Sequence, residues 1–340
     1  MTARRQPTRS APTLEAVAER AGVSRSTVSR VVNGSPKVTD EARAAVHAAI
    51  TELGYVPNHA ARSLASRRSH AIALVIQEAT PRIFTDPYFG ELVGGAVERL
   101  AESPYTLTLL IESETNPHRT RDDLLGGGVD GAIIISTHRG DRSYAEVQSK
   151  LPIVFSGRPV GPHGEDAVVV DIDNTAAGRT ATEYLIAHGR RRIATITGPM
   201  DMAAGLDRLA GWRAAIDAAG LEPGPIEIGD FTPHGGRAAM ERLLASGIEF
   251  DGLFAASAQM AHGALELLRE RGIRVPADLS VIGVDNDRFA ETADPPLTTI
   301  EQPTAEQGGE IAEVLVRLIE GRPAERLTIM PTRLVERASV

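Results

Sequence analysis

The stretch AGVSRSTVSRVVN, residues 21–33, decides the fold of the N-terminal part of the chain. Gly22 predicts a turn, and the Ser24 side chain can cap the helix that follows. The apolar positions of that helix recur on one face: Val28, Val31 and Val32. The other face carries two arginines, small hydroxyls and an amide, with no acidic residue. Such a helix is either an amphipathic surface helix or the second helix of a helix-turn-helix motif, which lies in the DNA major groove.

The residues around this stretch predict two more short helices. Thr13 can cap a helix that runs to about Arg20, and Thr39 can cap another that stops at Gly54. The third helix turns three apolar side chains inward: Val46, Ile50 and Leu53. Three short helices within about 45 residues predict a small bundle with a modest core.

The charge is unevenly distributed along the 340 residues. Residues 1–70 contain 11 Lys and Arg against 5 Asp and Glu, whereas the other 270 residues contain 25 against 40. The net charge of −9 conceals this difference. A basic N-terminal part on an acidic body indicates a polyanion partner for that part alone, and DNA is the expected polyanion.

Composition narrows the class of protein further. No apolar run approaches the roughly 20 residues of a membrane span, and the basic start MTARRQPTRSAPT has no apolar stretch behind it. The chain has no Cys, which excludes disulfides and thiolate metal sites and fits a reducing compartment. We therefore expect a cytoplasmic protein without a membrane partner, metal site or cofactor.

From residue 70 onward, short apolar runs alternate with helix-type segments. HAIALVIQ, GAIIIS, AVVVDI, RIATITG and LSVIGVD are typical of strands, and FGELVGGAVERLAES and RLAGWRAAIDAAG of helices. This alternation predicts α/β architecture with parallel, doubly wound sheets covered on both faces. The units are too many for one small domain, so we expect two lobes, with a ligand cleft outside the carboxyl ends of the strands.

The N-terminal part resembles the headpiece of the lactose-repressor/galactose-repressor (LacI/GalR) family. The resemblance rests on the ordered run VA..AGVS..TVSRV.N followed by LGY.PN..AR.L. It implies that Arg25, Ser26 and Arg30 face base edges, where arginine can contact guanine bidentately. It also implies further DNA contacts, which for the residues of this helix are mostly to phosphates. The further contact residues are Ser24, Thr27, Ser29, Asn33, Asn58 and His59. At Ala16, relatives often carry an acidic residue that closes a helix cap.

The stretch NHAARSLA after Pro57 is too short to be a stable helix alone. The resemblance implies a hinge that orders on the operator and inserts Leu64 into the minor groove, which kinks the duplex. An ordinary linker is the alternative.

The body also resembles this family's sensor, which is similar to periplasmic sugar-binding proteins. The matching stretches are DPYF, VDIDN, HGRRRIA, DRLAGW and PPLTTI. The resemblance implies a homodimeric repressor that binds a near-palindromic operator under control of a sugar-like effector. The expected division is a disordered basic arm (1–12), a headpiece (13–57), a hinge (58–68) and an effector-binding and dimerisation domain (69–340). The expected lobes are 69–169 with 299–327, and 170–298 with 328–340.

The resemblance also implies the effector-binding residues. Arg208 matches an arginine that hydrogen-bonds ligand hydroxyls or carboxylates, and Asp285 matches an acceptor for hydroxyls. Six others fall near pocket positions: Phe89, Ser136, Arg158, Phe231, Ser257 and Gln302. Two departures bear on the ligand, because relatives often have an acidic group at Gly157 and an Asp at Ala258. Only 4% of the residues are aromatic, so no stacking platform for a sugar is obvious, although Phe89, Phe231 and Trp212 are available.

Two other classes of protein remain open. An enzyme is disfavoured because the glycine-rich GGGVDG (126–131) lacks nucleotide-loop spacing and no H-E-x-x-H or G-x-S-x-G motif is present. A secreted sugar-binding protein is disfavoured by the basic N-terminal part. Dimerisation is favoured over tetramerisation because no heptad segment follows the strand-like RLVERA.

Overall fold

The computed structural model describes residues 12–32, 35, 37–55, 68–111, 117–139, 143–161 and 166–340. It contains two compact units, 1–69 and 70–340. Several predicted features lie outside the described residues: the arm up to residue 11, Asn33, and the hinge residues 58–67 with Asn58, His59 and Leu64.

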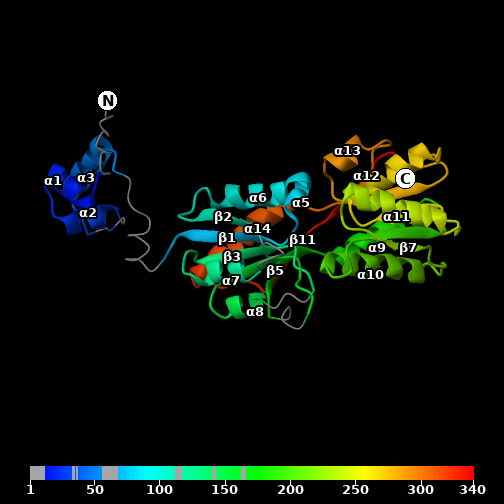
Figure 1. The fold of residues 1–340 in the computed structure, drawn as a ribbon, viewed down its shortest axis with the longest axis horizontal. Helices are drawn as coiled ribbons and strands as arrows, with labels where there is room; N and C mark the ends of the chain where they lie inside the picture. The colour runs from blue at the N-terminus through cyan, green and yellow to red at the C-terminus, as the bar shows by residue number, and fades with distance from the viewer. Residues whose placement is uncertain are drawn as a thin grey trace, which may run out of the picture. The chain divides into compact units, whose positions relative to one another are not determined.

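The first unit contains the three expected helices, α1 (Leu14–Ala21), α2 (Arg25–Val32) and α3 (Asp40–Leu53) (Figure 1). The Thr13 side chain caps α1 by accepting a hydrogen bond from the Ala16 backbone N–H, so this cap forms without an acidic residue at position 16. Thr39 caps α3 in the same way. The bundle encloses a small core: Val17, Ala18, Val28, Val31, Val46, Ala49 and Tyr55.

The second unit contains two six-stranded sheets. The first is entirely parallel, in the order β11-β5-β4-β3-β1-β2. Its strands are β1 (Ala71–Ile76), β2 (Thr106–Ile111), β3 (Gly131–Ile135), β4 (Ile153–Ser156), β5 (Val168–Ile172) and β11 (Leu327–Met330). β1 and β3 are buried along nearly their whole length, as the continuous apolar runs predict for a sheet covered on both faces.

The second sheet has the order β12-β10-β9-β8-β6-β7 and is parallel except for β12 at its edge. Its strands are β6 (Ile193–Thr197), β7 (Ile226–Ile228), β8 (Gly252–Ala255), β9 (Ser280–Val284), β10 (Thr298–Glu301) and β12 (Arg333–Val335).

Helices cover both faces of each sheet, so each lobe is a three-layer α/β/α sandwich (Figure 1). In the first lobe, α6 (Pro87–Leu100) and α14 (Thr304–Ile319) cover one face, while α7 (Pro117–Leu125) and α8 (Ser143–Gln148) lie on the other. In the second lobe, α9 (Asn174–Ala187) and α10 (Ala203–Ala218) pack together, as do α11 (Pro233–Ala245) and α12 (Ala258–Glu270). Two short helices complete the unit, α5 (Thr80–Thr85) and α13 (Arg288–Thr292). Within the described ranges, no helix is long and apolar enough to cross a membrane.

The chain passes between the lobes at three points, each a few residues later than expected. β5 belongs to the first sheet as far as Ile172, and β11 as far as Met330, whereas β10 belongs to the second sheet as far as Glu301. The approximate lobe boundaries expected at about 169/170, 298/299 and 327/328 each fall three residues before the end of the strand. The expected boundaries fell within or at the start of the apolar runs, but each strand stays in one sheet until its hydrogen-bonded pairing ends.

Glycines bring the paired helices into close backbone contact. A Cβ at Gly178 of α9 would lie 2.2 Å from the Arg208 carbonyl oxygen, and one at Gly211 of α10 would lie 2.1 Å from that of Thr175. Any larger residue would force the two helices apart. This contact places the start of α9 beside the middle of α10, where both helices reach the space between the lobes.

Candidate functional site

The exposed face of α2 carries the side chains expected to contact DNA. Arg25, Ser26 and Arg30 are exposed, whereas Val28 and Val31 are buried beneath them. The Ser24 hydroxyl accepts a hydrogen bond from the Thr27 backbone N–H at 3.2 Å, so it caps the helix. Two guanidiniums on an exposed helix face can reach both base edges and phosphates.

Arg25 is already engaged within the bundle. Its Nε lies 3.1 Å from the Glu15 carboxylate, and both side chains are largely exposed. An exposed ion pair of this kind contributes little free energy. Arg25 can therefore exchange Glu15 for a base or phosphate at small cost.

A cleft lies between the two lobes of the second unit. Its walls come from residues at or beyond the carboxyl ends of strands in both sheets, as expected for a doubly wound fold. All eight residues predicted for the effector site line it: Phe89, Ser136, Arg158, Arg208, Phe231, Ser257, Asp285 and Gln302. The mixture of apolar and polar walls suits a small organic ligand.

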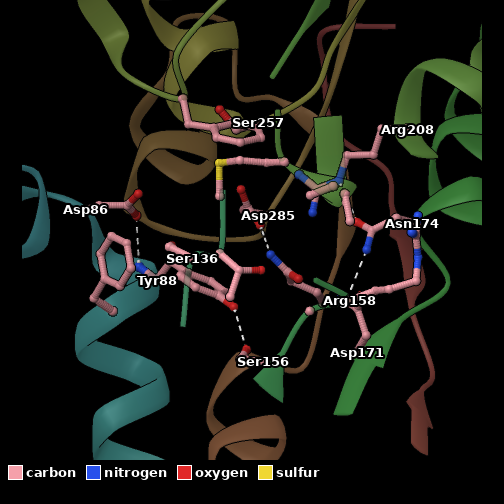
Figure 2. A pocket seen from close by; sticks show the side chains of 18 of the residues that line it. Asp86, Tyr88, Ser136, Ser156, Arg158, Asp171, Asn174, Arg208, Ser257 and Asp285 are labelled. Carbon is pink, nitrogen blue, oxygen red and sulfur yellow. Dashed lines mark hydrogen bonds between the residues drawn. The ribbon is translucent and has the colours of Figure 1, made fainter. Parts of the chain in front are cut away.

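Arg208 is a buried cation of the cleft. It projects from α10 and is 5% exposed. Its Nε donates to Asn174 Oδ1 at 2.9 Å, and one terminal nitrogen donates to the Ala256 carbonyl oxygen at 2.5 Å. The close approach of α9 and α10 makes the contact with Asn174 possible. The guanidinium is thus fixed before any ligand arrives (Figure 2).

Two carboxylates, one from each lobe, lie near each other in the cleft. Asp285 follows β9 and accepts a hydrogen bond from the Gln302 side chain, while Asp86 precedes α6 and accepts from the Tyr88 backbone N–H (Figure 2). Burial and the neighbouring Asp285 charge raise the pKa of Asp86 to about 6. Burial also raises the pKa of Asp285, although the Arg208 charge opposes this. Ionised, both groups are acceptors for ligand hydroxyls.

A third carboxylate of the cleft, Asp171 in β5, belongs to the first lobe. It accepts hydrogen bonds from the Ile172 backbone N–H at 2.8 Å and the Asn174 amide at 3.1 Å. Burial raises its pKa to about 6. A Cβ at Gly157 would lie 3.9 Å from this carboxylate. Asp171 therefore supplies a hydrogen-bond acceptor close to the position where relatives often carry an acidic side chain and this chain has Gly157. Gly157 has φ +85°, which favours glycine.

Aromatic side chains form the remaining surfaces. The Tyr88 hydroxyl lies 3.1 Å from the Ser156 hydroxyl (Figure 2). The Phe231 ring lies between two guanidiniums, with the Arg82 Cζ 5.4 Å and the Arg208 Cζ 6.0 Å from its centroid. Trp212, in contrast, is fully buried in the core beneath β8 and β9 and does not line the cleft, so of the three available aromatics only Phe89 and Phe231 reach the cleft.

Three cleft residues have unfavourable backbone conformations. Ser136, Phe231 and Asp285 have φ of +60°, +63° and +81°, in the left-handed region that non-glycine residues rarely adopt. Such conformations persist only where the surrounding structure imposes them, and they concentrate at functional sites. They aim side chains into the cleft from the loops after β3, β7 and β9.

At the rim of the cleft, His138 joins the two lobes. Its Nδ1 lies 2.8 Å from the Asp201 carboxylate of the second lobe, and its Nε2 lies 3.7 Å from Glu78 of the first. The backbone N–H of Arg139 also donates to the Asp201 carbonyl oxygen at 2.8 Å. Hydrogen bonding to Glu78 and Asp201 raises the pKa of His138 to about 9. At neutral pH His138 is therefore a cation between two carboxylates.

Comparison with known proteins assigns the family. Residues 13–58 match the model of bacterial regulatory proteins of the lacI family, and residues 182–340 match a periplasmic binding protein-like domain. The HTH-type transcriptional regulator CelR of Thermobifida fusca is 44% identical over 333 residues, which cover 96% of this chain and 98% of that protein. The chain belongs to the LacI family.

Other relatives agree with this assignment. The ribose operon repressor of Escherichia coli K12 is 36% identical over 96% of this chain and 99% of its own. A structure described as a transcriptional regulator CelR–cellobiose complex has a TM-score of 0.76 at 43% identity, covering 97% of this chain and 100% of that one. The lac repressor dimer bound to operator and the anti-inducer ONPF has a TM-score of 0.86 at 29% identity, covering 96% and 98%. The LacI-family chain is thus a transcriptional regulator with a helix-turn-helix headpiece and a two-lobed α/β sensor.

Several cleft residues were not predicted from the sequence of this LacI-family chain. They are Arg82, Asp86, Tyr88, Ser156, Asp171, Asn174 and Gln259. Asp86 and Asp171 lie within the stretches DPYF and VDIDN, so the motifs themselves held a signal for them. The helix α12 that begins at Ala258 is capped without an Asp at that position, because Ser257 accepts a hydrogen bond from the Met260 backbone N–H.

Proposed function

We propose that this regulator binds a near-palindromic operator as a homodimeric repressor and that a sugar in the interlobe cleft changes its operator affinity. The observation that carries the proposal is the composition of the cleft. Arg208, Asn174 and Asp285 come from one lobe, and Asp86 and Ser136 from the other. A ligand that contacts both walls favours one spacing of the lobes over others.

The groups in the cleft suit a sugar. Three carboxylates, several hydroxyls and a fixed guanidinium supply acceptors and donors for ligand hydroxyls, and the Phe231 and Tyr88 rings supply apolar surface. The similar structure named as a cellobiose complex supports the same class of ligand. We infer that the chain acts in the cytoplasm and leaves its ligand chemically unchanged.

For the headpiece, we propose that Arg25, Ser26 and Arg30 contact bases and that Ser24, Thr27 and Ser29 contact phosphates. Asn33, Asn58, His59 and Leu64 are proposed DNA contacts outside the described residues. The two sites communicate if the lobe spacing selected by the ligand changes the spacing of the two headpieces in the dimer.

Fluorescence anisotropy with labelled DNA tests the proposal. DNA from upstream of the regulator's own and neighbouring genes is titrated with protein, with and without cellobiose, glucose and ribose. We expect specific binding that one of these sugars shifts about tenfold or more. Binding that no sugar changes would contradict the sensor part, and no specific binding at moderate salt would contradict the operator part. Recovery of unaltered sugar after incubation separates a sensor from an enzyme.

A further inference from the structure

A buried glutamine of α14 lies behind Ser156, one of the residues that line the cleft. Gln307 is 1% exposed, and its amide nitrogen donates to the Val170 carbonyl oxygen at 3.1 Å. The Val170 contact holds the amide so that its second N–H faces the Ser156 hydroxyl oxygen, at a nitrogen–oxygen distance of 3.4 Å. Both donors of the Gln307 amide are therefore used.

The other end of this amide has no partner. Among the residues that the structure describes, none hydrogen-bonds to the Gln307 carbonyl oxygen Oε1, although this atom is buried. A buried polar atom without a hydrogen bond costs stability, so such atoms are rare and each needs an explanation. Ile311, one turn further along α14, belongs to the hydrophobic core of the first lobe. An apolar side chain at position 307 would therefore suit the fold better than glutamine does.

Ser156 connects the glutamine to the cleft. It ends β4, and its hydroxyl lies 3.1 Å from the hydroxyl of Tyr88 in α6, which also lines the cleft (Figure 2). The helices α6 and α14 are held close together, because a Cβ at Gly308 would overlap the Leu92 carbonyl oxygen. Gln307, Ser156 and Tyr88 thus form a chain of hydrogen bonds that leads from the core of the first lobe to the cleft.

The amide of Gln307 sets the direction of this chain. The Ser156 oxygen accepts from Gln307, so its own O–H can donate to the Tyr88 oxygen, which leaves the Tyr88 O–H to donate into the cleft. Burial raises the pKa of Tyr88 above its usual value, so the phenol keeps this proton at neutral pH. Hydrogen bonds in a chain polarise one another, and a donor at the start strengthens the donor at the end.

We propose that Gln307 is a positioning residue for the effector, which acts through Ser156 to fix the Tyr88 hydroxyl as a hydrogen-bond donor to a ligand oxygen. This inference rests on the proposed function and adds to it a residue that does not touch the ligand. The carboxylates of Asp86 and Asp171 accept from ligand hydroxyls, whereas a fixed Tyr88 donor selects a ligand oxygen that accepts. Gln307 therefore contributes to the choice of sugar.

Gln307→Met tests this inference on the full-length protein. Methionine keeps the length and approximate volume of the side chain but has no N–H. The Val170 carbonyl oxygen still accepts from the Gly157 backbone N–H at 3.2 Å, so the change creates no unpaired carbonyl there. Isothermal titration calorimetry is carried out with cellobiose, glucose and ribose. For the sugar that binds the wild type, we expect the affinity to fall about fivefold or more. We expect the melting temperature to stay equal or to rise.

The melting temperature separates positioning from support of the fold. A residue that only supports the fold would lose affinity and melting temperature together, so a clearly lowered melting temperature in Gln307→Met would contradict the inference. Unchanged sugar affinity would overturn it and leave the proposed function standing. If the wild type binds none of the three sugars while its operator binding is intact, the sugar-sensing part of the function fails, and the inference fails with it.

Gln148→Met is the matched control. The Gln148 amide also donates to a backbone carbonyl oxygen, that of Asp166 at 3.0 Å, but this residue does not line the cleft and none of its printed partners does. We expect it to bind the sugar with the affinity of the wild type. An equal loss of affinity in this variant would overturn the role assigned to Gln307.

A double-mutant cycle shows whether Gln307 acts through the Tyr88 hydroxyl. Tyr88→Phe removes this hydroxyl and should lower the affinity for the same sugar by a similar factor. In the Tyr88→Phe protein, Gln307→Met should then change the affinity less than about twofold, because the donor that it positions is gone. Losses that multiply in the double variant would overturn the proposed action through Tyr88.

Discussion

At the scale of the residue, the cleft depends on side chains that are fixed before the ligand arrives. Arg208 is held by one amide and one backbone carbonyl, so its remaining donors point into the cleft without a loss of side-chain entropy on binding. Asp285 is also fixed in place, because it accepts a hydrogen bond from the Gln302 side chain. Preorganisation of this kind favours affinity for a ligand whose hydroxyls match the fixed groups.

Arg208→Lys should remove the effector response and leave operator binding intact. Lysine cannot donate to Asn174 and Ala256 while also facing the cleft. We expect the effector affinity to fall about 10- to 100-fold, from the loss of charge-assisted hydrogen bonds. Calorimetry and anisotropy measure the two properties separately. Arg213→Lys on the same helix, where the guanidinium stacks on Trp212, is the control; an unaltered response in Arg208→Lys would place the ligand elsewhere.

Arg30→Ala should weaken operator binding by roughly 1–3 kcal/mol if this side chain contacts a base. The loss should be specific to the operator and small on random DNA. Arg20→Ala removes an exposed arginine that pairs with Glu52 and serves as the control for charge. Equal losses on both DNAs would make Arg30 a phosphate contact.

His138 predicts a dependence of stability on pH. Its pKa is raised in the folded protein to about 9, so its contribution is fully present below the unfolded value of about 6.5 and is lost as the pH rises through 9. Melting temperatures from pH 6 to 10 should therefore fall more steeply in the wild type than in His138→Gln. His188→Gln, a change at the C-terminus of α9, should follow the wild type. Parallel curves for all three proteins would show that His138 does not join the lobes.

At the scale of the element, the helix pair α9–α10 connects the sensor core to the cleft. The glycines at 178 and 211 set the distance between these helices and hence the contact between Arg208 and Asn174. The pair α11–α12 uses the same arrangement, since a Cβ at Gly263 would lie 1.9 Å from the Pro233 carbonyl oxygen.

Gly211→Ala should therefore affect both stability and ligand binding. The added methyl group forces the helices apart, which costs about 1–3 kcal/mol of folding free energy. The same movement separates Arg208 from Asn174 and should lower the effector affinity. Gly263→Ala should lose similar stability with little change in affinity. Thermal melts and calorimetry on both variants check this. Equal losses of effector affinity in the two variants would contradict the claim that the α9–α10 contact in particular positions the cleft residues.

Elements differ in how well the sequence predicts them. β1, β3 and β9 are continuous apolar runs and lie where expected. β7 was not predicted, because it has three residues at a sheet edge and two of its side chains are exposed. α14 was not predicted either, since the adjacent Gly308 and Gly309 weaken its helical pattern, and its burial against α6 compensates for this.

The residues of the cleft also differ in how well the sequence predicts them. Arg208 and Asp285 were predicted because they lie within stretches that resemble the family's sensor, RLAGW and SVIGVDN. Arg82 was not, because its place in the cleft depends on the short helix α5 and on the Phe231 ring from the other lobe. Sequence patterns indicate which residues end a strand, but they do not give the distance between two lobes joined by three crossings.

At the scale of the whole molecule, the proposed homodimer requires a surface through which two copies of the chain associate. Three large apolar side chains are exposed on neighbouring elements of the first lobe: Phe84 on α5, Val97 on α6 and Leu109 on β2. Phe84 is 72% exposed. An exposed apolar side chain of this size is a candidate for a contact with another protein.

Val97→Glu should therefore weaken the dimer. A charge placed among apolar side chains at an interface lacks a partner, so we expect the dissociation constant to rise about tenfold or more. Sedimentation velocity over a range of concentrations measures it, and operator affinity should fall with it. Ile248→Glu changes an equally exposed residue of the second lobe and should leave the dimer intact. The opposite result would move the interface to the second lobe.

The left-handed residues of the cleft have a further consequence for anyone who wishes to stabilise this sensor. Ser136 and Phe231 each carry backbone strain of about 1–3 kcal/mol that glycine would relieve. Thermostabilising selections on the ligand-free protein will therefore favour replacements there, and each replacement discards a side chain that lines the cleft. A biosensor built from this chain should gain its heat resistance from the outer helices and leave these loops untouched.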